Sequence, residues 1–358
     1  MSTSLKNFGI KFSTNIPVDE FIEKALYDPK FGYYTNKNPF GKSGDFITAP
    51  NISNLFSEII LIWLVSSWET FGKPKNFNFV ELGPGDGSLT KVISNTCKRF
   101  PEFDNAINIY LYEKSNFLKK IQKKKIKNNK IKWIKDFNSI KKGPVIFFGN
   151  EFFDAIPIKQ FLKKGDSFLE KCFNFKTNGL NESYQKALKK DVDQIVSYKT
   201  LNGLQFIEYP KLGLMELNKV VKKISSLKGG ILLVDYGYLN MINKNTLQSV
   251  MNNKKIDMKS LYKFCGNADI TSLVNFSLLR EYFNKKNLKT KKVVSQKFFL
   301  EKMGIMERVK ILEKNMTVKQ KNYFSITLNR LLNKDSMGEL FKVIFAYKSK
   351  NEDFLGFD

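Results

Sequence analysis

The sequence predicts an α/β protein built on a doubly wound, mostly parallel sheet. Short apolar segments with the length of buried strands alternate with helical segments along the chain. The chain has 358 residues, of which 42% are hydrophobic, so it supplies a sizeable core and suggests about two folding units at roughly 150 residues each. The longest unbroken apolar run, 59–65, is far shorter than the ~20 residues of a membrane span. We therefore expect a soluble protein without a membrane-spanning segment.

Residues 1–75 predict a helical N-terminal extension that packs on the core. Apolar residues recur at helical spacing after Pro17, with Phe21, Ile22, Ala25 and Leu26 on one face. A connector rich in Gly and Pro follows at 28–50, and an apolar helix is expected at 53–68.

Residues 76–358 predict the sheet domain, with insertions at about 158–210 and 238–300. The elements expected in it are strands at 77–82, 107–112, 131–134, 145–148 and 231–234, helices at 88–99, 212–227, 273–283 and 295–302, and an apolar C-terminal segment at 341–347. Strand-like fragments at 168–175 and 205–209 lie in the first insertion. Strands that alternate with helices at this spacing indicate parallel connections.

The absence of histidine excludes several kinds of chemistry. A chain without histidine has no Ser-His-Asp or Cys-His nucleophile, no His-ligated zinc and no imidazole acid–base group. Cys97, Cys172 and Cys265 lie far apart in the sequence, so neither a zinc cluster nor a disulfide framework is expected. Any reaction must depend on carboxylates, amides, hydroxyls, Lys, Arg, backbone groups or a cofactor, and no metal is expected.

The net charge of +26 comes mainly from lysine. Only four of the 60 basic residues are arginines, whereas sites that recognise phosphates and bases favour the planar arginine fork. The densest basic run, 119–132, carries isoleucines at intervals and predicts the solvated face of a surface helix, with contact to an acidic partner as the alternative. We expect no specific nucleic-acid partner, although nonspecific adhesion to RNA at low salt is expected.

The strongest local pattern is a glycine turn between an expected strand and an expected helix. Glu81 precedes Gly83, Gly85 and Gly87, and Asp86 lies between the last two glycines. The G-x-G-x-G spacing differs from the G-x-G-x-x-G spacing of dinucleotide sites, which place a pyrophosphate on a helix N-terminus. Two carboxylates beside the turn favour a cationic ligand, and S-adenosylmethionine carries an ammonium and a sulfonium group. The alternative is a tight connection with no ligand.

Glu113 supports a nucleoside-bearing ligand. It ends the second expected strand, where a carboxylate can accept hydrogen bonds from both ribose hydroxyls. Taken alone, Glu113 is equally consistent with an exposed acid at a strand end. Together with the glycine turn in one βαβ unit, it predicts a cofactor site formed by Glu81, Gly83, Gly85, Gly87 and Glu113.

The chain resembles the MidA family of S-adenosylmethionine-dependent methyltransferases. The motifs that carry the resemblance are 25–34 (ALYDPKFGYY), 44–50 (GDFITAP), 81–87 (ELGPGDG), 150–157 (NEFFDAIP), 235–237 (DYG), 266–271 (GNADIT) with Phe276, 296–300 (QKFFL) and 337–342 (MGELFK). The resemblance implies a class I, Rossmann-like methyltransferase fold, with the helical extension and the inserted segments forming a substrate or cap region. It also implies that S-adenosyl-L-methionine is the cofactor and that Asn150 belongs to the cofactor site.

The resemblance further implies an acceptor. Mitochondrial members of the family are complex I assembly factors that symmetrically dimethylate an arginine of a core subunit. We therefore expect a protein arginine methyltransferase that acts on a complex I subunit or its bacterial counterpart. The protein would be cytoplasmic in a bacterium or located in the mitochondrial matrix in a eukaryote.

Glu151 and Asp154 are the expected acceptor residues. They follow the fourth strand at the carboxyl edge of the sheet, three residues apart at an expected helix start. Paired carboxylates can hold a planar guanidinium and localise its charge away from the attacking nitrogen. The alternative is that Asp154 caps the helix and Glu151 favours its N-terminal dipole.

Asp45 is a third catalytic candidate, from a possible lid in the N-terminal extension. Gly44, Asp45 and Phe46 combine a flexible residue, an acid and an aromatic ring, which suits a segment that closes over a ligand; a turn before a helix is the alternative. Asp269 and Thr271 are expected to cap a helix rather than to act on a ligand.

Three other functions remain open on the sequence. The acceptor can be a small molecule or RNA, or the chain can be a non-catalytic assembly factor that keeps the fold. The glycine spacing makes a nicotinamide oxidoreductase the least favoured reading.

Overall fold

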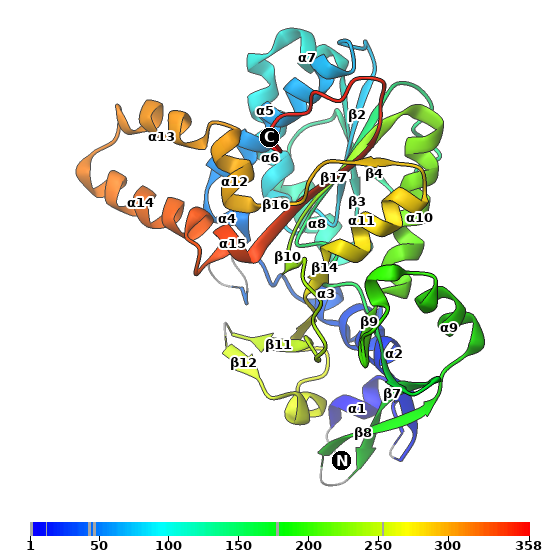
Figure 1. Ribbon diagram of the computed structural model, residues 1–358. Coiled ribbons are helices and arrows are strands. Elements are labelled where there is room, and N and C mark those ends of the chain that lie inside the picture. Colours follow the sequence, from blue (N-terminus) through cyan, green and yellow to red (C-terminus); the bar gives the residue numbers. More distant parts are fainter. Residues whose placement is uncertain (1–2, 12, 42–43, 46–47, 177–178, 253) are drawn as a thin grey trace.

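The computed structural model describes residues 3–11, 13–41, 44–45, 48–176, 179–252 and 254–358. Its centre is a twisted sheet with the strand order β15-β17-β10-β5-β2-β3-β4, in which β14 also pairs with β10 and β16 with β17 (Figure 1). The strands are β2 (Phe77–Leu82), β3 (Ile107–Tyr112), β4 (Ile131–Ile134), β5 (Val145–Asn150), β10 (Gly229–Tyr238), β14 (Val274–Asn275), β15 (Lys289–Thr290), β16 (Val294–Ser295) and β17 (Phe341–Lys348). β4, β3, β2, β5 and β10 run parallel, whereas β17 is antiparallel to β10.

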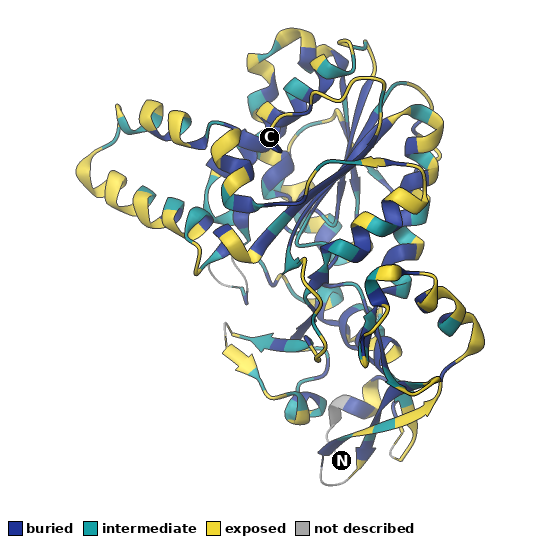
Figure 2. Cartoon of the chain, in the orientation of Figure 1, coloured by how far each residue is buried: buried dark blue, intermediate teal, exposed yellow. Residues whose placement is uncertain are grey.

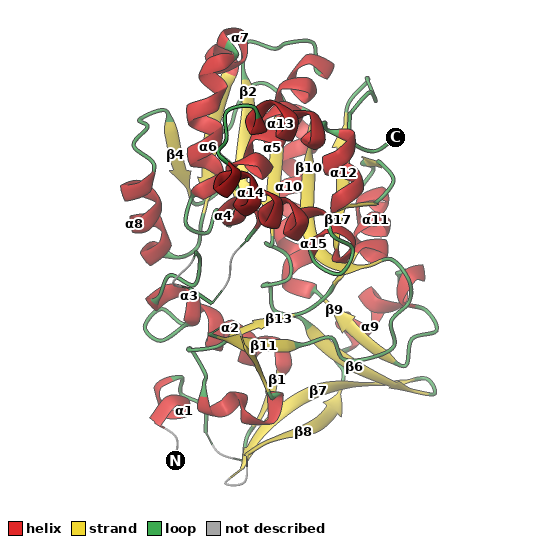
Figure 3. Ribbon diagram, turned by 90° about the vertical axis from the view of Figure 1, so that its left-hand side faces the viewer, coloured by secondary structure: helices red, strands yellow, loops and turns green. Residues whose placement is uncertain are grey.

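Helices cover both faces of this sheet, which confirms the doubly wound α/β fold (Figures 1 and 3). Alternate strand residues face opposite layers: Phe79 belongs to one core cluster and Val80 to the other. The first cluster includes residues of α5 (Asn54–Thr70), α6 (Ser88–Thr96), α7 (Pro101–Ala106) and α12 (Gln296–Lys302). The second includes residues of α9 (Lys189–Val196), α10 (Lys211–Leu227) and α11 (Phe276–Lys285).

A smaller lobe lies below the sheet in the view of Figure 1. One of its sheets has the order β1-β7-β6-β9 with β8 on β7, and the other has the order β12-β11-β13. The strands are β1 (Asn15–Pro17), β6 (Lys159–Lys164), β7 (Ser167–Lys176), β8 (Gly179–Lys186), β9 (Phe206–Tyr209), β11 (Gln248–Met251), β12 (Lys254–Ile256) and β13 (Asp269–Thr271). The helices α1 (Thr3–Asn7), α2 (Val18–Tyr27) and α3 (Tyr33–Asn36) and the 3-10 helix Met258–Lys263 share a separate apolar core with β7, β8 and β13. Phe161 of β6 and Ile207 of β9 belong instead to the second cluster of the central sheet. Figure 2 shows buried residues in both the central sheet and the smaller lobe.

The N-terminal extension contributes residues to the core of the central sheet and to the core of the smaller lobe. Phe21 and Leu26 of α2 belong to the core of the smaller lobe, whereas Trp63 of α5 packs edge-to-face on Phe345 of the central sheet at 5.0 Å between ring centroids. The extension is also not wholly helical, because Asn15–Pro17 pair antiparallel with β7. The division into domains at residue 75 stays a prediction.

Most expected strands occur at the expected residues, but several helices differ. The helix expected at 88–99 is α6 followed by a 3-10 turn at Cys97–Arg99, and α11 begins at Phe276 rather than at 273 because Val274–Asn275 pair with β10. The remaining helices are α4 (Ala49–Ile52), α8 (Asn116–Lys125), α13 (Ile305–Glu313), α14 (Val318–Leu332), α15 (Met337–Leu340) and the 3-10 helix Lys199–Leu201. The hairpin of α13 and α14, which we did not expect, projects from the side of the core (Figure 1). Among the described residues, no helix has the length and apolar character that crossing a membrane requires.

Lys159 should be essential to the stability of the smaller lobe. Its ammonium group is buried between Glu170 and Asp19, with Nζ 3.3 Å from Asp19 Oδ1. Lys159→Ala leaves two buried carboxylates without their cation, so the free energy of unfolding should fall by about 3–5 kcal/mol in urea denaturation. Lys73→Ala, which removes an exposed pair with Glu69 and a contact with the Trp68 ring, is the control and should cost less than about 1 kcal/mol. Equal effects of the two substitutions would contradict this account.

Candidate active site at the carboxyl ends of the strands

The glycine turn connects β2 to α6 and forms one wall of a cavity. Gly83 and Gly85 have φ values of +60° and +56°, a region that residues with a side chain rarely adopt. The turn is closed by hydrogen bonds from Gly83 N to the Tyr112 carbonyl at 3.0 Å and from Gly87 N to the Pro84 carbonyl at 2.9 Å. A Cβ on Gly83 would lie 2.9 Å from the ring of Phe152. Gly83 and Gly85 line the cavity, whereas Gly87 does not.

The two acids of the turn, Glu81 and Asp86, both interact with other side chains or backbone groups of the protein. Glu81 lies buried below the turn, accepts a hydrogen bond from the Thr90 hydroxyl, and does not line the cavity. Burial raises its pKa to about 8. Asp86 accepts a hydrogen bond from Ser88 N at 3.0 Å, next to the start of α6, and pairs with Lys125 at 2.6 Å. Neither acid therefore faces a ligand directly, which differs from our electrostatic argument from the sequence.

Glu113 follows β3 and lines the cavity. Its carboxylate accepts hydrogen bonds from Ser115 N at 2.8 Å and from Gln122 Nε2 at 3.1 Å. Burial raises its pKa to about 7 despite these donors. The fully buried Gln122 also donates to the Gly85 carbonyl at 2.8 Å and accepts from Trp133 Nε1 at 2.9 Å. Gln122 thus joins the glycine turn to Glu113.

Gln122 was missed in the sequence analysis, although a signal for it exists. It lies four residues after Leu118 and four before Ile126, on the apolar face of a helix whose other face is lysine-rich. A polar residue on the apolar face of a helix is normally buried with hydrogen-bond partners, so its position predicts such partners.

The segment after β5 is a turn and not the helix start that we expected. Glu151 has a φ of +50°, and Asp235 of β10 accepts hydrogen bonds from the backbone of Phe153 at 2.9 Å and of Asp154 at 3.2 Å. Asp235 therefore holds the turn, and the capping roles considered for Glu151 and Asp154 do not apply. Asn150 donates to Glu151 Oε1 at 3.1 Å and does not line the cavity.

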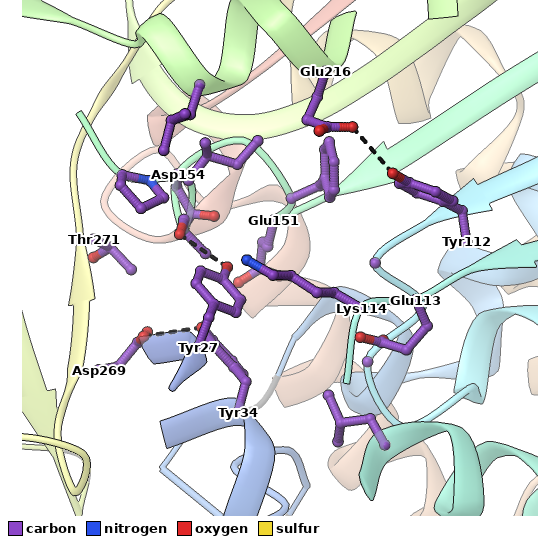
Figure 4. Close-up of a pocket in the computed structure, with 18 of the residues that line it drawn as sticks. Tyr27, Tyr34, Tyr112, Glu113, Lys114, Glu151, Asp154, Glu216, Asp269 and Thr271 are labelled. Carbon is purple, nitrogen blue, oxygen red and sulfur yellow. Dashed lines mark hydrogen bonds between the residues drawn. The ribbon is translucent and has the colours of Figure 1, made fainter. Parts of the chain in front are cut away.

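Glu151 and Asp154 both line the cavity (Figure 4). Burial raises the pKa of Glu151 to about 8, and the charge of Asp154 adds to this rise. Burial raises the pKa of Asp154 to about 6, against a hydrogen bond with Tyr236 that lowers it. Asp154 is only 6% exposed, and its Oδ1 has no hydrogen-bond partner among the described residues. A buried carboxylate oxygen without a hydrogen bond lowers the stability of the fold, so a ligand that donates a hydrogen bond to this atom would gain binding energy.

The smaller lobe supplies the opposite wall. Tyr27, Tyr34, Asp269 and Thr271 line the cavity, and Figure 4 shows them across from Glu113 and Tyr112. Asp269 and Thr271 lie on β13, so our expectation that they cap a helix is wrong; Asn275 caps α11 instead. The local sequence pattern contained no indication that these residues reach the sheet edge.

Asp45 lies outside the cavity lining. It accepts hydrogen bonds from the Tyr33 hydroxyl, from Lys37 Nζ and from Asn252 N, each at 2.6 Å. Burial alone would raise its pKa, but the hydrogen bonds from Lys37, Tyr33 and Asn252 lower it. Asp45 thus joins the N-terminal extension to the second insertion, and Phe46 of the same motif lies outside the described residues.

Acidic side chains predominate in the lining of the cavity, although the whole chain is basic. Its volume is about 680 Å³, within the usual range for sites that bind small molecules. Six carboxylates line it (Glu23, Glu113, Glu151, Asp154, Glu216 and Asp269), against three lysines (Lys114, Lys119 and Lys135). Lys114 is neutralised by an ion pair with Glu23. In the part of the chain that the structure describes, no group of His, Cys, Asp or Glu is arranged to hold a metal ion. An acidic cavity in a chain of net charge +26 favours a cationic organic ligand.

Comparisons with known proteins agree with this geometry. A family of S-adenosyl-L-methionine-dependent methyltransferases matches residues 59–294. The mitochondrial protein arginine methyltransferase NDUFAF7 of Xenopus tropicalis is 28% identical over 94% of this chain and 83% of its own length. The homologous protein of Caenorhabditis elegans is 30% identical over 97% of this chain and 86% of its own length.

The fold of the entire chain is similar to that of a solved structure. It is the crystal structure of a Burkholderia thailandensis protein bound to S-adenosyl-homocysteine, with a TM-score of 0.79 and 20% sequence identity. The match covers 100% of this chain and 91% of that one. The two proteins therefore share one fold, which includes both the central sheet and the smaller lobe.

The buried acids predict a characteristic dependence of stability on pH. Burial raises the pKa of Glu81 and Glu151 to about 8 and that of Asp269 to about 7, whereas these groups ionise near pH 4 in an unfolded chain. The folded protein therefore binds more protons, and the stability that these groups contribute at low pH is lost as pH rises through 7–8. The urea midpoint should be lower at about pH 8.5 than at about pH 5.5.

Two substitutions test the origin of this effect. Glu151→Gln should reduce the difference between the two midpoints, because the amide has no charge to lose. Glu102→Gln, at an exposed position in α7, should leave the difference unchanged. A midpoint that rises between pH 5.5 and 8.5 would contradict the assignment of these groups as buried acids.

Proposed function

The chain belongs to the family of S-adenosyl-L-methionine-dependent methyltransferases, and we propose that it methylates an arginine side chain of a protein. The observation that carries this proposal is the acid-lined cavity with the unpartnered Asp154 Oδ1 beside Glu151. A guanidinium is cationic, planar and rich in donors, so it matches a cluster of buried carboxylates. The names of the NDUFAF7 relatives, which are protein arginine methyltransferases, support the same acceptor.

We assign the cofactor to the side of the cavity formed by the glycine turn and Glu113. Gly83 and Gly85 leave the backbone open to a ligand, and Glu113 would accept hydrogen bonds from ribose hydroxyls. Glu81, Gly87 and Asn150 would act indirectly, by shaping the turn and the end of β5. S-adenosyl-L-methionine supplies an activated methyl group on a sulfonium, so the protein's task is to position the acceptor and exclude water.

Glu151 and Asp154 would hold the acceptor. Hydrogen bonds from the guanidinium to the two carboxylates orient one nitrogen towards the methyl group and stabilise charge on the other nitrogens. The nitrogen that gains the methyl group loses a proton. Because burial raises the pKa of Glu151 to about 8 and that of Asp154 to about 6, either carboxylate is suited to receive this proton near neutral pH.

The family resemblance supports a proposal for the protein substrate and for the location of the enzyme. We propose a respiratory complex I core subunit, or its bacterial counterpart, as the protein partner. The eukaryotic relatives are named mitochondrial proteins. We accordingly propose the mitochondrial matrix for a eukaryotic source and the cytoplasm for a bacterial one, without a specific nucleic-acid partner.

Long-range electrostatic repulsion opposes the arginine proposal, and the acids of the cavity must overcome it. The net charge of +26 would repel a free cationic acceptor. An arginine in an acidic protein avoids this repulsion, because the protein as a whole is attracted while its arginine enters the acidic cavity. The alternatives are an RNA or small-molecule acceptor, or a non-catalytic assembly role.

Substitutions at the cofactor wall should separate binding from catalysis. Glu113→Ala should weaken S-adenosylhomocysteine binding by about 1–3 kcal/mol in calorimetry, the range for loss of charge-assisted hydrogen bonds. Gly85→Val should abolish binding, because φ is +56° and a Cβ would lie 3.3 Å from the Phe40 ring. Glu102→Gln is the control. Unchanged heats for Glu113→Ala would remove Glu113 from the cofactor site.

Transfer of labelled methyl groups tests the acceptor. Purified protein incubated with labelled S-adenosylmethionine and cell extract should label an arginine-containing protein, and its Arg→Lys variant should remain unlabelled. Asp154→Asn should lower turnover by roughly two to three orders of magnitude and change S-adenosylhomocysteine affinity by only a few-fold. Asp166→Asn, in an exposed turn of the smaller lobe, should behave as wild type. Label on RNA or a small molecule would refute the arginine proposal, and absence of label would favour the non-catalytic alternative.

A further inference from the structure

The smaller lobe places one more acid opposite Asp154. Asp269 begins β13, is 3% exposed, and lines the cavity together with Thr271 two residues further on the same strand. The Tyr34 hydroxyl donates to Asp269 Oδ1 at 2.9 Å. The backbone carbonyl of Asp269 accepts a hydrogen bond from the Ser249 hydroxyl at 2.8 Å, which fixes β13 on β11. Asp269 is thus rigidly placed, although nothing in the fold of β13 requires a carboxylate there.

Two stacked tyrosines accompany Asp269. The rings of Tyr27 and Tyr34 are 5.6 Å apart with an interplanar angle of 24°, and both line the cavity (Figure 4). Tyr27 donates to the Ala155 carbonyl at 3.0 Å, so its ring is held against the turn that carries Asp154. Burial raises the pKa of both tyrosines, and the charges of Asp269 and Asp154 add to this effect. The two phenols therefore stay neutral. Lys114 Nζ lies over the Tyr27 ring at 4.3 Å from its centroid, and the Tyr34 ring also stacks on Phe40.

Two acids of this region have no ion-pair partner in the part of the chain that the structure describes. Within the described ranges, neither Asp154 nor Asp269 forms an ion pair with a lysine or arginine, although the chain carries 60 basic residues. Asp154 and Asp269 repel each other and raise the cost of their burial. Buried charges in proteins are normally paired, so the pattern indicates a cation that is not part of the chain.

We propose that Asp154 and Asp269, with the tyrosine pair beside them, form one guanidinium subsite shared by the central sheet and the smaller lobe. The proposal rests on the arginine methylation proposed above and names the lobe as the element that selects the acceptor. A planar guanidinium can donate from different edges to two carboxylates at once. A lysine ammonium has neither the fork nor the plane, so the subsite favours arginine.

Binding of N-acetyl-arginine amide to the full chain saturated with S-adenosylhomocysteine tests the subsite by calorimetry. Asp269→Asn should weaken this binding at least tenfold, while S-adenosylhomocysteine affinity stays within about twofold. The KM of the labelled arginine protein should rise similarly. Asp257→Asn, an exposed aspartate of the same insertion, is the matched control and should match wild type in every measurement. N-acetyl-lysine amide should bind more weakly than the arginine probe to the wild type.

Two further variants distinguish a binding role from a structural one. Tyr34→Phe keeps the ring and removes one donor, so it should cost only a few-fold in probe affinity, whereas Tyr34→Ala should cost at least as much as Asp269→Asn. Because Asn can still accept from Tyr34 and carries no buried charge, Asp269→Asn should leave the melting temperature at pH 8.5 unchanged or higher. A structural carboxylate would instead lower it.

The possible failures can be told apart. Equal probe affinity and equal KM in Asp269→Asn and wild type would overturn the subsite and leave arginine methylation intact. Methyl label on an acceptor other than arginine, with no binding of the arginine probe, would overturn both proposals. A fall in melting temperature with unchanged probe affinity would assign Asp269 to the fold alone.

Discussion

The position of the cavity depends on the parallel pairing of β2 with β5. From this pair the connections lead in opposite directions, to β3 and β4 on one side and to β10 on the other. Leu82 pairs with Gly149, so the glycine turn and the segment after β5 leave the sheet side by side. A crevice at such a point is a property of the topology, and any ligand site there can draw on the ends of several strands. The smaller lobe closes this crevice because its inserted strands begin directly after β5 and β10.

The charge distribution gives the crevice its chemical character. The chain is strongly basic, yet the acids that line the cavity outnumber its lysines two to one. Burial disfavours the ionised forms, so these acids lower stability at neutral pH unless a cation joins them. Because these acids destabilise the ligand-free protein, binding of a cationic ligand should raise the free energy of unfolding. The local field therefore determines what enters the cavity, while the overall charge determines which large partner approaches.

Much of the central sheet was predictable from the sequence because its strands are short, wholly buried apolar runs. β2, β3 and β4 begin and end at the expected residues. The smaller lobe was not predictable to the same degree, since its strands are half polar and pair over long distances, as Asn15 does with Asn174. In the site, Gly83, Gly85, Glu113, Glu151 and Asp154 were identified from strand ends and motifs. Gln122 and Asp269 were not, because their partners lie on other elements: Gln122 contacts Gly85, and Asp269 contacts Tyr34.

The acids that maintain the fold accept hydrogen bonds from neighbouring elements, whereas an acid available to a ligand keeps an oxygen without a donor. Asp235 uses one oxygen to accept two backbone N–H groups of the turn after β5, and thereby stabilises a turn in which Glu151 has a positive φ. Glu81 and Asp45 likewise accept hydrogen bonds that join neighbouring elements. Asp154, at the end of the turn that Asp235 holds, keeps Oδ1 without a partner among the described residues. Well-satisfied carboxylates therefore hold in place a carboxylate with one unsatisfied oxygen, and in this way a strained and acidic site can persist in a stable fold.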